Sequence, residues 1–134
     1  MPTSVASRPL PDYDGRMDLT PYVESVRRHV AELKRRNAEA QARARGDLPK
    51  LVAELRRDDR IRKAYLYGSL AKDTFHPDSD IDIAVDGLDP RELDGLRKRL
   101  EPLTEFRVDL RDLDGTPEFR KVIEFYGVVL HDTI

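Results

Sequence analysis

The sequence predicts an α/β fold in which a sheet is covered by helices and preceded by a helical extension. Two observations lead to this prediction. After residue 60, short segments with alternating apolar side chains are separated by segments whose apolar residues recur every three or four positions, which is typical of strands that alternate with helices. Before residue 60, only the helical spacing occurs. We therefore expect a flexible arm (1–19), a helical extension (20–59) and a core (60–134).

Length and composition exclude several classes of protein. The chain has 134 residues, which is enough for one compact domain, and a formal net charge of −2. It has no cysteine, which excludes a disulfide framework and thiolate metal sites. No apolar run approaches the ~18 residues that a membrane span needs, and the N-terminal sequence lacks the pattern of a secretion signal. We expect a cytoplasmic protein without membrane contact.

Charge is unevenly distributed along the chain. Basic residues outnumber acidic ones in residues 21–63, and acidic residues outnumber basic ones in residues 64–134. A basic helical surface could meet an acidic partner or nucleic acid, or it could simply be solvated. It lacks the interleaved aromatic residues of many nucleic-acid surfaces, so we expect no direct nucleic-acid binding. The acidic core favours bound cations.

The helical extension reads as two helices. Thr20 followed by Pro21 is typical of a helix start, and Gly46 after Arg45 is typical of a helix end. Asp47 would then cap a second helix. The apolar residues that recur at helical spacing are Val23, Val26, Val30 and Leu33 in the first helix and Leu51, Val52 and Leu55 in the second.

The core reads as three strands and two helices, followed by a short edge strand. The strands are IRKAYLYG, DIDIAVDG and EFRVDL, and VVLH is the edge strand. A capping-box pattern over residues 89–92 opens the first helix, and Thr116 before Pro117 opens the second. Tyr65 and Tyr67 share one face of the first strand and are interpreted as packing residues. Strand alternation separates an apolar from a polar face, the polar one carrying Asp80, Asp82, Arg107, Asp109 and Arg111.

Two carboxylates point the same way at the end of the stretch GSLAKDTFHPDSDID. Asp80 and Asp82 are two positions apart on a predicted strand, so their Cα atoms lie ~6.6 Å apart on one face. Two carboxylates at that spacing repel each other unless a cation lies between them. All-oxygen ligands suit Mg²⁺ or Mn²⁺ better than zinc. Taken alone, the pattern is more often that of a solvated acidic strand than that of a metal site.

The other end of the same stretch suits an anion. Gly68 and Ser69 directly follow a strand, where a short helix is expected to begin. A glycine lets the backbone approach a phosphate closely, and Ser69 could cap the helix or offer its hydroxyl and N–H groups to the anion. Phosphoryl or nucleotidyl transfer needs both a phosphate site and a metal site.

A Gly-Ser pair followed by ten residues and then by Asp-x-Asp is the signature of the polymerase-beta-like nucleotidyltransferases. The segments YLYGSLAKDTFHPDSDIDIAV, RVDLRDL and IEFYGVVLHD resemble those of the minimal nucleotidyltransferase (MNT) branch, whose members are encoded beside HEPN proteins. The resemblance covers residues 61–132. It implies a polymerase-beta-like fold with a small mixed sheet flanked by helices, here with an N-terminal helical extension.

The resemblance also implies roles for particular residues. Gly68 and Ser69 would hold the triphosphate of ATP. Asp80 and Asp82 would bind two Mg²⁺ ions, with Mn²⁺ as an alternative, and Asp109 would supply the third catalytic carboxylate. Asp112 competes for that last role, but strand parity favours Asp109.

One departure from the family pattern lies next to the Gly-Ser pair. Family members usually have Arg-Gly where this chain has Lys72 and Asp73. Lys72 keeps a cation that would contact the β or γ phosphate. Asp73 replaces a glycine and adds a negative charge near the expected triphosphate site.

The function implied by the resemblance is that of an antitoxin in a toxin–antitoxin pair. The chain would move AMP from ATP to a hydroxyl, expected to be a tyrosine's, of a HEPN ribonuclease toxin and so silence it by AMPylation within a hetero-oligomer. Two alternatives remain open: a weakly catalytic antitoxin that acts by complex formation alone, and a nucleotidyltransferase for a small molecule such as an aminoglycoside.

Overall fold

The computed structural model describes residues 18–133, so almost all of the expected arm (1–19) lies outside the described residues. The chain divides into two compact units, Met1–Leu33 and Lys34–Ile134. The predicted boundary between the extension and the core at residue 59 stays a prediction.

Helix α1 (Thr20–Arg56) is continuous, so the predicted break at Gly46 is wrong. Gly46 is exposed, with no atom within 4 Å of an added Cβ, so it weakens the helix without ending it. Asp47 lies inside the helix, where its Oδ2 accepts a hydrogen bond from the Thr104 hydroxyl at 2.8 Å. At the start of the helix, the Thr20 N–H donates to Asp18 Oδ1 at 2.9 Å, and Thr20, expected as the cap, is itself the first helical residue.

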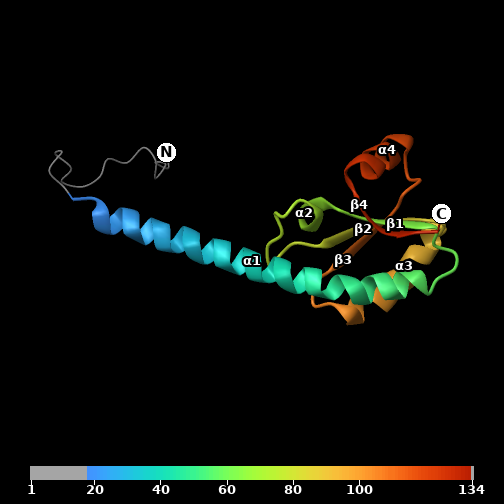
Figure 1. The fold of residues 1–134 in the computed structure, drawn as a ribbon, viewed down its shortest axis with the longest axis horizontal. Coiled ribbons are helices and arrows are strands. Elements are labelled where there is room, and N and C mark those ends of the chain that lie inside the picture. Colours follow the sequence, from blue (N-terminus) through green and yellow to red (C-terminus); the bar gives the residue numbers. More distant parts are fainter. Residues whose placement is uncertain (1–17, 134) are drawn as a thin grey trace, which may run out of the picture. The chain divides into compact units, whose positions relative to one another are not determined.

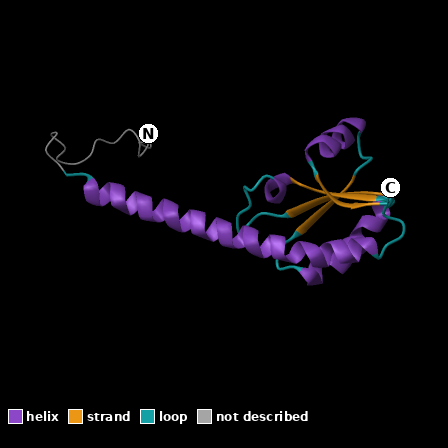
Figure 2. Ribbon diagram, viewed as in Figure 1, coloured by secondary structure: helices purple, strands orange, loops and turns teal. Residues whose placement is uncertain are grey.

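Four strands form one mixed sheet with the order β3-β2-β1-β4. They are β1 (Lys63–Tyr67), β2 (Ile81–Asp86), β3 (Val108–Asp112) and β4 (Val128–Asp132). Strand β1 pairs antiparallel with β2 and β4, and β2 pairs parallel with β3. The prediction of a small α/β sheet with a final edge strand is confirmed (Figure 2).

Three shorter helices complete the second unit: α2 (Gly68–Ala71), α3 (Leu93–Leu100) and α4 (Pro117–Tyr126). Two predicted helix starts are confirmed. The capping box of Asp89 and Glu92 is formed and opens a short 3-10 turn that leads into α3. The Thr116 hydroxyl accepts a hydrogen bond from the Phe119 N–H at 3.0 Å at the start of α4.

The sheet has two unlike faces within the second unit. Residues 34–56 of α1 and helix α3 cover one face, and α4 covers part of the other (Figure 1). The first face holds the main core, which includes Leu51 and Leu55 of α1 and the alternating apolar residues of the strands. The second face has a smaller cluster of Tyr65, Ala84, Leu113 and Ile123. By alternation it also carries Asp82 and Asp109.

Candidate active site

Adjacent strands bring three polar side chains of the second face into a row. In the parallel register of β2 and β3, Asp82 lies opposite Asp109. In the antiparallel register of β1 and β2, Tyr67 lies opposite Asp82. Neighbouring strands are about 4.8 Å apart, so side chains at paired positions on one face are neighbours. The sheet itself therefore fixes the spacing of the two carboxylates.

The site has an excess of negative charge. Burial, together with the nearby carboxylates of Asp109 and Asp80, raises the pKa of Asp82 to about 6. Arg111 opposes this shift and lies with its Nε 3.5 Å from Asp109 Oδ2. One arginine faces three carboxylates, so a cation bound at this point would be favoured.

Asp80 is less closely involved than Asp82 and Asp109. It directly precedes β2 and is partly exposed, and its effect on Asp82 is electrostatic. Within residues 18–133, no three His, Asp or Glu side chains are arranged as a ready set of metal ligands. Asp112, the alternative to Asp109, lies opposite Val85, three positions further along the strands. The register thus places Asp109, and not Asp112, beside Asp82.

Gly68 makes room for Asp82. Its φ is +74°, and a Cβ added at this position would lie 2.1 Å from Asp82 Oδ2. Any other residue would therefore collide with the carboxylate and would adopt a left-handed backbone that side chains disfavour. The structure brings the predicted phosphate-binding turn and the predicted metal site into direct contact.

Ser69 lies in the first turn of α2 but does not cap it. The N-cap is Tyr67, and no side chain caps this helix. The Ser69 carbonyl instead accepts the N–H of Thr74 at 3.0 Å, which closes the turn after α2. Of the two roles considered for the serine hydroxyl, capping is excluded.

The negative charge of Asp73 is held by partners on α1. Its carboxylate accepts hydrogen bonds from Arg45 Nη2 and, at 3.3 Å, from Gln41 Nε2, both on α1. Its φ is 61°, a conformation in which glycine is favoured. The aspartate therefore adopts a backbone conformation that glycine favours, and its charge is paired with Arg45. The neighbouring Lys72 is exposed and, with Gly68, lines a cavity of about 320 Å³ between α2 and α4.

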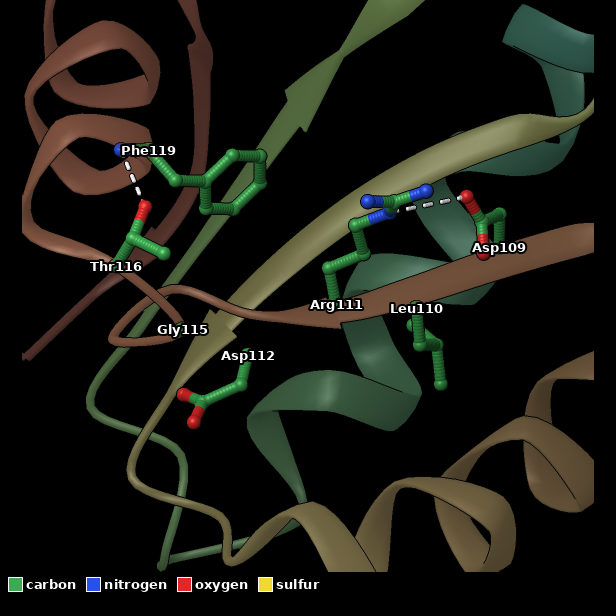
Figure 3. Close-up of a pocket in the computed structure, with 7 residues that line it drawn as sticks. All are labelled: Asp109, Leu110, Arg111, Asp112, Gly115, Thr116 and Phe119. Carbon is green, nitrogen blue, oxygen red and sulfur yellow. Dashed lines mark hydrogen bonds and ion pairs between the residues drawn. The ribbon is translucent and has the colours of Figure 1, made fainter.

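A second cavity of about 570 Å³ opens beside Asp109, between β3 and the start of α4. Figure 3 shows Arg111 extending toward Asp109, while Phe119 faces the site from α4. The backbone turn at Gly115 and Thr116 forms its outer wall. This space can admit a group to the carboxylates from the side of the sheet that α4 covers.

Tyr67 was interpreted as a packing residue, and that interpretation missed its hydroxyl. Within the described residues, the Tyr67 hydroxyl is the only buried side-chain polar atom without a hydrogen-bond partner. Burial, together with the charges of Asp82 and Asp109, raises the pKa of Tyr67 to about 12. Its ring packs edge-on against Phe119, with centroids 5.7 Å apart. The sequence did contain a sign that Tyr67 lies at the site: it directly precedes Gly68, and strand alternation puts it on one face with Tyr65.

Comparisons with known proteins agree with this geometry. The family described as "Polymerase beta, Nucleotidyltransferase" matches residues 49–133. A toxin–antitoxin structure with AMP-PNP is 31% identical, with a TM-score of 0.57, over 64% of this chain and 73% of that chain. A comparison with curated proteins gave no match.

Two further solved structures are similar. The toxin–antitoxin MntA-HpeT with two aspartate-to-glutamate substitutions two positions apart is 27% identical (TM-score 0.55; 64% of this chain, 73% of that chain). A tri-AMPylated Shewanella oneidensis HEPN toxin in complex with MNT antitoxin is 26% identical (TM-score 0.52; 66% of this chain, 72% of that chain). The family model covers more than half of the chain, so this chain belongs to the polymerase beta nucleotidyltransferase family.

Proposed function

We propose that this chain is an MNT-type antitoxin that transfers AMP from ATP to a hydroxyl, expected to be a tyrosine's, of a HEPN toxin and so neutralises it. The observation that carries the proposal is the pairing of Asp82 with Asp109 directly against Gly68. This contact supports the proposal, because the turn that we assign to the triphosphate lies directly beside a pair of carboxylates.

The similar structures support the choice of nucleotide and partner. One of them holds AMP-PNP, and another contains an AMPylated HEPN toxin with its MNT antitoxin. A third changes two aspartates with the same spacing as Asp80 and Asp82. A hetero-oligomer with a HEPN protein follows from the same comparison. Within residues 18–133, no helix has the length and apolarity to cross a membrane.

The residues present fit divalent metal ions. Asp80, Asp82 and Asp109 offer only oxygen donors, which suit Mg²⁺ or Mn²⁺, and burial with the neighbouring carboxylates leaves the site short of positive charge. When bound, two such ions would offset the charge that develops on the attacking and leaving oxygens. We assign these three aspartates as the ligands.

The remaining residues hold the nucleotide and move the proton. Gly68 and Ser69 hold the triphosphate through the backbone of the turn, and Lys72 contacts its outer phosphates. The acceptor oxygen attacks the α-phosphorus and forms a new P–O bond, while the bond to the bridging oxygen breaks and pyrophosphate leaves. Asp109 accepts the proton of the acceptor hydroxyl. The cavity beside Asp109 is the route by which that hydroxyl arrives.

The test is to incubate the chain with a purified HEPN protein encoded beside its gene, Mg²⁺ and ATP, and to measure intact masses. We expect a gain of one or more adenylyl groups on the HEPN protein and its loss with Asp82→Asn. Asp78→Asn is the matched control, because Asp78 is an exposed loop carboxylate near the same strand. Stable complex formation without mass gain would refute the transfer and support neutralisation by binding alone.

A further inference from the structure

The first unit carries an apolar stripe that stays exposed. Val23, Val26, Val30 and Leu33 are each 41% to 47% exposed on α1. These four residues, which we call the valine seam, recur at spacings of three, four and three. Exposed apolar stripes on helices are characteristic of contact surfaces, because burying each such side chain is favourable.

The spacing of the valine seam identifies what would cover it. Its four residues occupy positions a, d, a and d of two heptads, the pattern by which one helix packs against another. Val23 and Val30 stand at a, and Val26 and Leu33 stand at d. Both a positions are β-branched and one of the two d positions is leucine, a composition close to the one that favours pairing with a single second helix.

The residues on either side of the valine seam, at positions e and g, indicate which charge the second helix would carry. Position e holds Arg27 and the g positions hold Tyr22 and His29, whereas Glu24 and Glu32 stand at the outer positions b and c. All of the flanking positions on residues 20–33 thus lack an acidic side chain. Two copies of this chain would gain no ion pair along the seam in either orientation, because e and g residues face each other. A helix with acidic flanks would gain them.

We propose that the valine seam is a docking site for an amphipathic helix of the partner protein, with Asp or Glu on both sides of its apolar stripe. The identity of that partner as the AMP acceptor rests on the proposed function, but the binding itself does not. The seam would hold the acceptor protein while the second unit modifies it. Docking through one element and chemistry through another raises the effective concentration of the acceptor hydroxyl.

The test uses the full chain and two synthetic helices of the same length and the same Val/Leu stripe. One helix has Glu at every e and g position and the other has Lys. By fluorescence anisotropy at low salt, we expect the Glu helix to bind at least about tenfold more tightly than the Lys helix. Arg27→Glu should reverse this preference. Arg28→Glu is the matched control, because Arg28 is the adjacent exposed arginine at the outer position f.

Three results would overturn the proposal. They are equal affinity for the two helices, no binding of either, and loss of the preference in Arg28→Glu to the same degree as in Arg27→Glu. A second copy of this chain is the other possible occupant, and sedimentation of the chain alone tests it. A dimer that Val26→Asp converts to a monomer would show that a second copy covers the seam, which would also overturn the proposal. None of these measurements contains ATP. The docking proposal can therefore be tested even if the chain proves not to transfer AMP.

Discussion

Replacing Gly68 by alanine tests the contact between the phosphate turn and the carboxylate site. The added methyl group would lie 2.1 Å from Asp82 Oδ2, whereas ordinary contact begins at 3.4 Å. The carboxylate oxygen must therefore move by more than 1 Å, or the turn must shift. A misplacement of about 1 Å in a catalytic group can lower the rate about a hundredfold. We expect a loss of transfer activity of this size.

The same substitution also lowers stability. Alanine at a φ of +74° costs about 1–2 kcal/mol relative to glycine. We expect the free energy of unfolding, measured by urea titration, to fall by this amount, with ATP turnover measured on the same samples. The fold should survive, because such a loss is small against the stability of a typical domain.

Gly95→Ala is the matched control. Gly95 lies in α3 with nothing within 4 Å of an added Cβ, and alanine is favoured over glycine in a helix by about 0.5–1 kcal/mol. This variant should gain stability and keep full activity. If Gly68→Ala behaved like Gly95→Ala in both measurements, the close approach of Gly68 to Asp82 would be disproved.

Three further substitutions test other contacts. Tyr67→Phe should keep or slightly raise the free energy of unfolding, measured by urea titration, because it removes a buried hydroxyl that has no partner within the described residues; a loss of more than about 1 kcal/mol would show that this hydroxyl forms a hydrogen bond. Asp73→Gly should leave the KM for ATP within about twofold, because the Asp73 charge is bound by α1 and not aimed at phosphate; a large fall in KM would show repulsion instead. Arg60, with a contribution from Arg99, holds the pKa of Asp58 at about 2, below the usual 3.8, so this carboxylate stabilises the fold above pH 4 and loses that effect as the pH falls toward 2. Asp58→Asn should remove about 1 kcal/mol of stability at pH 7 and flatten the pH dependence of thermal melting between pH 4 and 2; an unchanged acid limb would contradict the assignment.

The strands and the second-face carboxylates could be predicted from sequence because strand alternation is a strict two-residue period. It placed Asp82 and Asp109 on the face opposite the core, as the structure has them. The pairing of the two residues could not be predicted, since register depends on contacts far apart in the chain. The contact of Gly68 with Asp82 could not be predicted for the same reason, because it depends on the pairing of β1 with β2.

The long helix was the main error in the fold. A glycine is a common helix end, but the buried residues Ala40, Ala44, Leu51 and Leu55 keep a helical spacing across Gly46. Their packing into the core outweighs the cost of one glycine, which is about 1 kcal/mol. Reading the apolar period through the glycine, rather than stopping at it, would have given one helix.

Because β2 and β3 pair directly, the geometry of the site does not depend on the length of the chain that connects them. Twenty-one residues lie between these strands, in a connection that includes α3. Because backbone hydrogen bonds between the strands set the distance from Asp82 to Asp109, insertions or deletions in that crossover can be absorbed without moving either carboxylate. The crossover is thus a place where new recognition elements can be grafted, by evolution or by design, while the chemistry stays intact.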